Sequence, residues 1–131
     1  MAESLSLSAV FKATPERLFK AWLDSGEHSA FTGDKADIDP QIGGKFTAWD
    51  GYIRGTTTKM EEYSRIIQKW RTTDFKDDHE DSVLEIIFKS LSDDTCELTL
   101  NQSNIPDGQA EDYKSGWEDY YFAPMHEYFD Q

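Results

Sequence analysis

Two glutamines stand among aromatic residues, in segments whose period would turn them toward the protein interior. In the segment "RIIQKWR", strand alternation puts Gln68 on the same face as Trp70. In "TCELTLNQS", it puts Gln102 on an otherwise apolar face. A concave apolar surface with a few polar groups is typical of a small-molecule site. The two amides are therefore candidates for orienting a ligand.

The alternative is that both amides serve a packed core, where they pair with each other, with a tyrosine hydroxyl or with buried water. Trp22, Trp49 and Trp117 are interpreted first as packing residues. The residue types leave both alternatives open. The candidates for lining a ligand cavity are Phe46, Gln68, Trp70, Gln102, Trp117, Tyr121 and Met125.

Metal-binding chemistry has little support in the sequence. His28 is expected in a helix, and His126 on the polar side of a later one. The run "DDHED" (77–81) is the dense cluster of candidate ligands, but it lacks the glycine and the spacing of a calcium loop. The longer acidic run "DFKDDHED" (74–81) is interpreted as a solvated loop, with a basic partner surface or a solubility margin as the functional alternative. We expect no metal and no cofactor.

Nucleophilic catalysis is not indicated either. A reactive cysteine needs an exposed, electropositive setting, whereas Cys96 lies on an apolar strand face of an acidic chain. The sequence contains no G-x-S-x-G, Walker or G-x-G-x-x-G pattern. We expect no catalytic residues and no enzymatic activity.

The charge of the chain restricts its partners. Thirteen basic and 26 acidic residues give a net charge of −13, which disfavours nucleic acids and anionic membrane surfaces. The start "MAESLSLSAVF" has neither the basic region nor the apolar run of a signal peptide. A single cysteine fits a reducing cytoplasm. The length of 131 residues predicts a single domain, 1–131.

The elements that must position these residues follow the order strand, helix, strands, helix. The segment 4–11 alternates like a half-buried strand, and Thr14-Pro15 predicts the start of a helix, with a second short helix before Gly33. Asp50-Gly51 predicts a hairpin turn. Further strands are expected in the segments 34–40, 45–49, 52–60, 65–75, 83–90 and 95–103. Such segregation of strands and helices predicts an α+β fold.

The last segment, "GWEDYYFAPMHEYF" (116–129), predicts the helix that covers the sheet. At about 100° per residue, Trp117, Tyr120 and Tyr121 cluster on one face with Pro124, Met125 and Tyr128, while Phe122 and Phe129 widen the apolar arc. Because Pro124 lacks an N–H and crowds the preceding turn, we expect a kink or a new helical start there. The acidic polar face argues against a membrane-surface helix.

Six segments carry a family resemblance. They are "GGKF", "DGYIRG", "RIIQKWR", "TCELTL", "NIP" and "GWEDYYFAPM". Their order and spacing resemble the C-terminal domain of the activator of the 90-kilodalton heat-shock chaperone's ATPase, and the many free-standing bacterial domains like it. The resemblance covers nearly the whole chain. It implies a helix-grip, START-like fold, in which a curved antiparallel sheet of six or seven strands wraps around a long C-terminal helix.

The resemblance also implies a function. The leading expectation is a non-enzymatic, chaperone-activator-like interaction module of the cytoplasm, acting on a chaperone ATPase in stress response. Relatives in the wider superfamily bind lipids, hormones or polyketides between sheet and helix. The alternative is therefore a carrier or sensor of a small hydrophobic ligand. Fold alone does not choose between the two.

Overall fold

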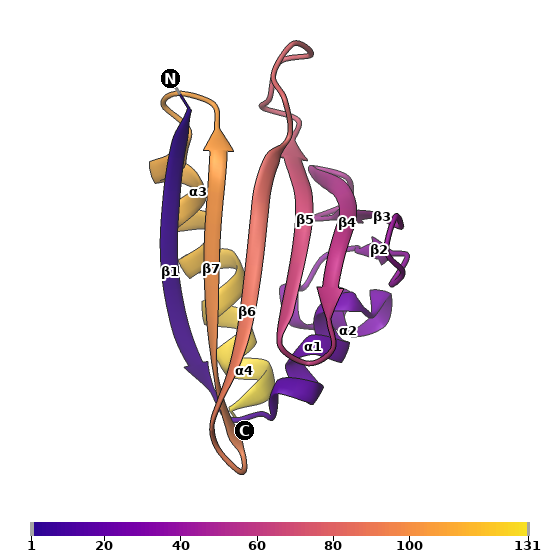
Figure 1. The fold of residues 1–131 in the computed structure, drawn as a ribbon, viewed down its shortest axis with the longest axis vertical. Helices are drawn as coiled ribbons and strands as arrows, with labels where there is room; N and C mark the ends of the chain where they lie inside the picture. Colours follow the sequence, from indigo (N-terminus) through magenta and orange to yellow (C-terminus); the bar gives the residue numbers. More distant parts are fainter. Residues whose placement is uncertain (1, 131) are drawn as a thin grey trace.

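Seven antiparallel strands form one curved sheet in the order β1-β7-β6-β5-β4-β3-β2, as Figure 1 shows. The computed structural model describes residues 2–130. Consecutive strands from β2 to β7 are neighbours, and β1 closes the series by pairing with β7. The bounds are β1 Glu3–Phe11, β2 Asp37–Ile38, β3 Lys45–Ala48, β4 Ile53–Glu61, β5 Arg65–Thr72, β6 Ser82–Ser92 and β7 Thr95–Ile105. The expected α+β fold and its strand number are confirmed.

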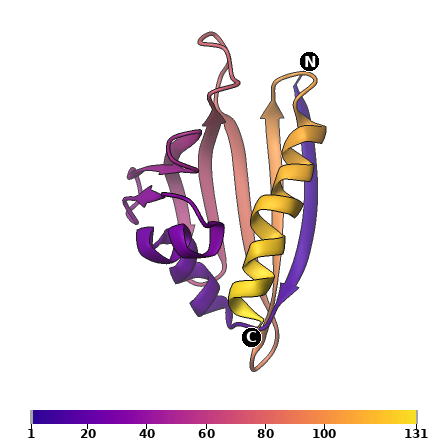
Figure 2. The same cartoon turned by 180° about the vertical axis from the view of Figure 1, so that it is seen from behind.

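Two short helices follow the first strand, as the sequence predicts. Helix α1 (Pro15–Leu23) begins where the Thr14 hydroxyl accepts a hydrogen bond from the backbone N–H of Arg17. Helix α2 (Ser25–Thr32) is capped in the same way by Asp24. It ends at Gly33, whose φ of 82° lies in the left-handed region that glycine adopts without strain. These helices cover the part of the sheet that the C-terminal helix leaves open (Figure 2).

The C-terminal helix runs without interruption from residue 110 to residue 129 on the concave face of the sheet (Figure 2). It consists of α3 (Ala110–Trp117), the π-helical turn η1 (Glu118–Phe122) and α4 (Ala123–Phe129). The Ala123 N–H donates to the carbonyl of Glu118, five residues earlier. The irregularity expected at Pro124 takes the form of a π-helical turn that ends at Phe122, after which α4 begins at Ala123 with the proline in its first turn.

The π-helical turn also corrects the predicted apolar face. Tyr120, expected to face the sheet, is 61% exposed. A π-helical turn rotates less per residue than an α-helix, so the residues after Trp117 are turned back relative to a regular helix. This rotation brings Phe122 and Phe129 onto the buried face of the helix, and it leaves Tyr120 at the solvent-exposed edge of that face.

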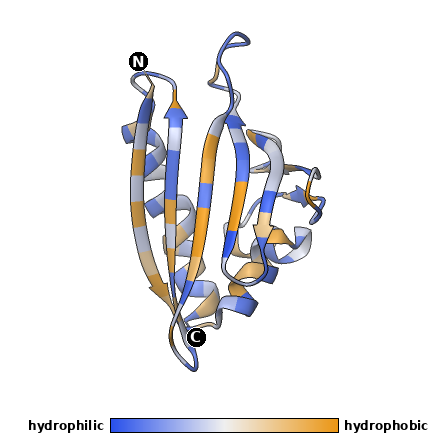
Figure 3. Cartoon of the chain, in the orientation of Figure 1, coloured by the Kyte–Doolittle hydropathy of each residue, from blue (hydrophilic) through white to orange (hydrophobic). Residues whose placement is uncertain are grey.

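The core fills the space between the sheet and the helices. Alternation along the strands separates buried from exposed side chains, and Figure 3 shows the resulting change between hydrophobic and hydrophilic residues. The faces predicted for β5 and β7 are confirmed, since Ile66, Gln68 and Trp70, and likewise Cys96 and Gln102, are buried. Within residues 2–130, none of the helices combines the length and the apolar character needed to cross a bilayer.

Candidate functional site

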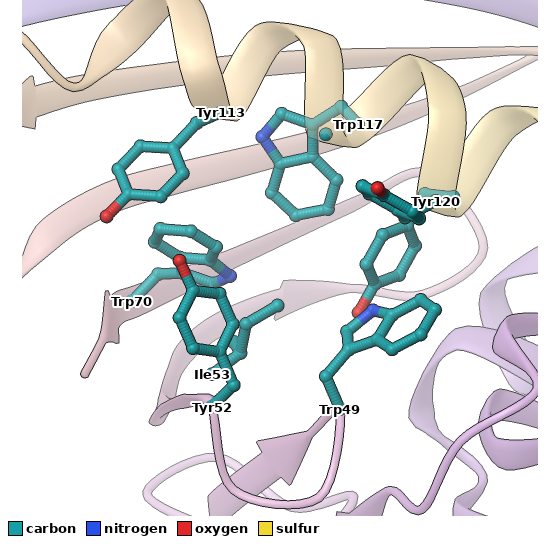
Figure 4. Close-up of a pocket in the computed structure, with 9 residues that line it drawn as sticks. Trp49, Tyr52, Ile53, Trp70, Tyr113, Trp117 and Tyr120 are labelled. Carbon is teal, nitrogen blue, oxygen red and sulfur yellow. The ribbon is translucent and has the colours of Figure 1, made fainter. Parts of the chain in front are cut away.

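An aromatic pocket of about 330 Å³ opens between the C-terminal helix and the β3–β4 turn (Figure 4). We call it the aromatic pocket. Nine residues line it: Trp49, Tyr52, Ile53, Trp70, Tyr113, Gly116, Trp117, Tyr120 and Tyr121. Such a volume is in the range of small-molecule sites, about 300–1,000 Å³.

Local structure explains how these side chains meet. Tyr113, Trp117 and Tyr121 are spaced by four residues, so they lie on one face of the helix. Trp70 points up from the concave face of β5 beneath them. The opposite wall comes from residues 49–52, the turn that the Asp50-Gly51 pair predicted.

This turn has an unusual backbone. Trp49, Asp50 and Gly51 all have positive φ, at 52°, 55° and 92°. Positive φ at successive residues matches the twist of a tight hairpin and reverses the chain within four residues, between Ala48 and Ile53. The two ends of the turn then present Trp49 and Tyr52 toward the helix (Figure 4).

The hydroxyls of two lining tyrosines, Tyr113 and Tyr52, are hydrogen-bonded to neighbouring side chains. Tyr113 bonds to the hydroxyl of Thr72 at 2.7 Å and donates to the amide of Gln109 at 2.6 Å. Tyr52 donates to the carboxylate of Asp74 at 2.6 Å. Burial raises the pKa of Tyr113 to about 12, and burial together with the Asp74 carboxylate raises the pKa of Tyr52. These groups are therefore neutral donors at physiological pH.

At the inner end, Tyr121 is hydrogen-bonded to His28 at 2.9 Å. The other ring nitrogen of His28 faces the carbonyl oxygen of Trp22 at 2.9 Å. Because a carbonyl only accepts, Nδ1 carries the proton and Nε2 accepts from the Tyr121 hydroxyl. Burial lowers the pKa of His28 to about 4 and raises the pKa of Tyr121. The pair is a neutral contact that holds the Tyr121 ring in place, and it is not arranged for proton transfer near neutral pH.

The two glutamines are hydrogen-bonded inside the core. Gln102 accepts from the indole N–H of Trp117 at 2.9 Å and donates to the hydroxyl of Ser82 at 3.0 Å. Gln68 donates to the hydroxyl of Thr57 at 3.2 Å and accepts a longer bond from Trp22 at 3.5 Å. Their partners are thus indole and hydroxyl groups rather than each other or a tyrosine.

The seven residues predicted to line a cavity fall into three places. Trp70, Trp117 and Tyr121 line the aromatic pocket. Phe46 and Gln68 line a void of about 10 Å³ behind those three rings, at the lower limit for one water molecule. Gln102 and Met125 are 1% exposed and belong to the packed core.

The sequence reasoning missed four aromatic residues of the pocket: Trp49, Tyr52, Tyr113 and Tyr120. The spacing of Tyr113 four residues before Trp117 was a usable signal. Within the described part of the chain, no three His, Cys, Asp or Glu residues converge to hold a metal ion. Cys96 is buried, and burial raises the pKa of its thiol to about 11, so it stays protonated.

Residues 12–130 match the family described as activator of Hsp90 ATPase homolog 1-like protein. The chain belongs to this family. It is 28% identical to the human activator of 90 kDa heat shock protein ATPase homolog 1 over 125 residues, which are 95% of this chain and 36% of the human protein. The activator homolog of Dictyostelium discoideum is 25% identical over 88% of this chain and 30% of that protein. The chain therefore spans about a third of the curated activators it matches.

Solved structures of the activator family share the fold. An Hsp90 activator from Plasmodium falciparum superimposes with a TM-score of 0.89 at 26% identity, covering 95% of this chain and 94% of the other. The Aha1 dimer from Colwellia psychrerythraea gives a TM-score of 0.75 at 11% identity, covering 98% and 94%. The expected START-like, helix-grip architecture is thereby confirmed.

Proposed function

We propose that this chain is a non-enzymatic interaction module that binds a chaperone ATPase of the Hsp90 class and raises its ATP turnover. The observation that carries the proposal is the family match over residues 12–130. The likeness to an Hsp90 activator of nearly equal length supports it, because the superposition covers 95% of this chain and 94% of the activator's chain. We further propose that residues 1–131 act as one domain in the cytoplasm, as part of a stress response.

The charge of the chain supports a protein partner with a basic surface. At a net charge of −13, association with such a surface would be accelerated at low ionic strength and slowed by salt. The same charge argues against nucleic acid and anionic membrane as partners.

Calorimetric titration of the purified chain into the Hsp90-class chaperone of the same organism tests this proposal. We expect saturable binding that weakens when salt rises from about 50 to about 500 mM. A variant with Asp77, Asp78 and Glu80 neutralised tests the acidic loop as the contact, and neutralising Glu16, Glu61 and Glu62 is the matched control. Absence of binding at both salt concentrations would contradict the proposal.

The aromatic pocket supports a second function, the binding of a small hydrophobic ligand as a carrier or sensor. Its volume is about 330 Å³ and its walls are almost entirely aromatic. We propose Trp70, Trp117 and Tyr121 as contact residues, with Phe46, Gln68, Gln102 and Met125 behind them as supporting core.

Filling the pocket tests this second function. A Cβ on Gly116 would meet no atom within 4 Å, so Gly116→Leu places its side chain in the pocket. Ser115→Leu adds the same side chain at an exposed neighbouring position. We expect that ligands which raise the melting temperature of the parent chain also do so for Ser115→Leu and not for Gly116→Leu. Equal shifts in both variants would place the ligand elsewhere.

A further inference from the structure

The walls of the aromatic pocket consist of electron-rich rings. Seven of its nine lining residues are tryptophan or tyrosine, and none is lysine or arginine. The faces of these rings carry negative electrostatic potential and attract cations, most strongly for tryptophan. Figure 4 shows the rings arranged around a common space.

Three pairs of lining rings meet at steep angles, whereas Trp70 and Trp117 are tilted by 40° and Trp117 and Tyr121 by 54°. The planes of Trp49 and Tyr120 meet at 72° with centroids 5.8 Å apart, and those of Trp70 and Tyr113 at 83° and 5.1 Å. Trp49 also meets Tyr121 at 67°. In an edge-to-face pair the edge of one ring covers a face of the other, so only the ring that contributes its edge keeps both of its faces available for an occupant.

Three of the four tyrosines that line the pocket already have hydrogen-bonded hydroxyls. The hydroxyls of Tyr52, Tyr113 and Tyr121 are bonded to Asp74, to Thr72 and Gln109, and to His28. Directional recognition of a neutral polar ligand through these three hydroxyls would have to break these bonds. A quaternary ammonium group has no N–H to donate, so it needs only ring faces and negative potential.

The two segments that supply most of the lining, the turn and the C-terminal helix, carry more acidic than basic residues. The turn 49–53 and the helical segment 110–121 together carry five acids, Asp50, Glu111, Asp112, Glu118 and Asp119, against one base, Lys114. All six side chains are exposed. The Asp74 carboxylate lies one hydrogen bond beyond the lining residue Tyr52. Acidic surroundings of a low-dielectric cleft raise the local concentration of cations.

We propose that the aromatic pocket binds a small organic cation with a quaternary ammonium group, such as the trimethylammonium head of choline. This inference rests on the second proposed function, that the pocket takes a small ligand, and it names the chemical class of that ligand. The cation would sit among Trp49, Trp70 and Trp117, with Tyr52 and Tyr120 at the mouth.

Choline and its neutral isostere 3,3-dimethylbutan-1-ol provide the test, because they differ in the charge of one central atom. Titration of each into the ¹⁵N-labelled chain at constant ionic strength is followed by the indole N–H signals of the four tryptophans. We expect choline to shift the signals of Trp49, Trp70 and Trp117 and to bind at least tenfold more tightly than the isostere. A tenfold ratio corresponds to about 1.4 kcal/mol.

Two variants sharpen the result. Trp49→Leu combined with Tyr120→Leu keeps an apolar lining but removes two rings at the edge of the pocket, so the preference for choline should fall below about threefold. Asp74→Asn keeps an acceptor for Tyr52 while removing the charge, and should weaken choline but not the isostere. Asp93→Asn in the distant β6–β7 turn is the control and should change neither.

Each result decides the proposal. Equal or tighter binding of the isostere would overturn the cation assignment while leaving the pocket as a ligand site. No saturation by either compound below about 10 mM would contradict both the assignment and the second proposed function. A preference for choline that stays at tenfold or more after the double leucine substitution would show that the aromatic pocket is not its site.

Discussion

Replacing Gln102 by methionine should destabilise the fold, because the amide satisfies buried polar groups on two elements. Its side chain is 1% exposed, and it links the indole N–H of Trp117 on the helix to the hydroxyl of Ser82 on β6. Methionine has similar length and no strong hydrogen-bonding group. The substitution therefore removes both bonds with little change in volume.

The magnitude follows from these two bonds. Leaving the indole N–H of Trp117 buried without a partner costs about 1–3 kcal/mol. Ser82 keeps its bond to the carbonyl of Trp70 at 2.7 Å, so losing the Gln102 partner costs only about 1 kcal/mol more. We expect a total loss of about 2–4 kcal/mol in the free energy of unfolding. That is a large share of the roughly 5–15 kcal/mol of a typical domain.

Urea denaturation followed by far-ultraviolet circular dichroism measures this loss, with the m-value expected to stay constant. In a Trp117→Phe background there is no indole N–H that could lose its partner. The loss in the free energy of unfolding caused by Gln102→Met should therefore be smaller by about 1–2 kcal/mol. Gln41→Met at an exposed position is the control and should stay within about 0.5 kcal/mol of the parent. If Gln102→Met also stays within that margin, the amide does not hold the helix to the sheet and this reasoning is refuted.

The remaining predictions concern stability and backbone geometry. Because burial lowers the pKa of His28 from 6.5 to about 4, the unfolded chain binds the proton more readily, and stability should fall by up to about 3 kcal/mol as pH drops from 6.5 to 4. In His28→Gln, the free energy of unfolding should depend less on pH over this range, as measured by denaturation at several pH values. A variant with the same pH dependence as the parent would contradict this prediction. Gly55→Ala should cost about 2 kcal/mol or more, since its Cβ would overlap the carbonyl oxygen of Lys69 on the neighbouring strand. Gly116→Ala, where a Cβ meets nothing within 4 Å, should instead stabilise the helix by about 0.5–1 kcal/mol. Thermal denaturation should therefore show a lower melting temperature for Gly55→Ala and a higher one for Gly116→Ala.

Local patterns in the sequence were sufficient for the order of the elements and the α+β class, whereas the helix-grip architecture was implied by the family resemblance. The period of two along β5 and β7 placed Gln68, Trp70 and Gln102 on buried faces, and the Thr14-Pro15 pair marked the start of α1. These signals depend only on neighbours along the chain. The order of elements then left the C-terminal segment as the cover of the sheet.

The site was harder to predict because it depends on residues far apart. Tyr121 and His28 are 93 positions apart, and no local pattern indicates their hydrogen bond. Trp49 and Tyr52 reach the pocket only because the turn between them reverses with positive φ and the sheet curves toward the helix. The exposure of Tyr120 follows from a π-helical turn, whereas the regular spacing of about 100° assumed an α-helix throughout.

Steady-state ATP turnover by the Hsp90-class chaperone of the same organism, with and without this chain, tests the central proposal most directly. The background measured with an inhibitor of the chaperone's ATP site is subtracted. We predict that turnover rises with the concentration of the chain and saturates over the same range in which calorimetry detects binding. Turnover that stays at the basal rate while binding saturates would contradict the activator function, and a flat rate with no binding would refute the interaction itself.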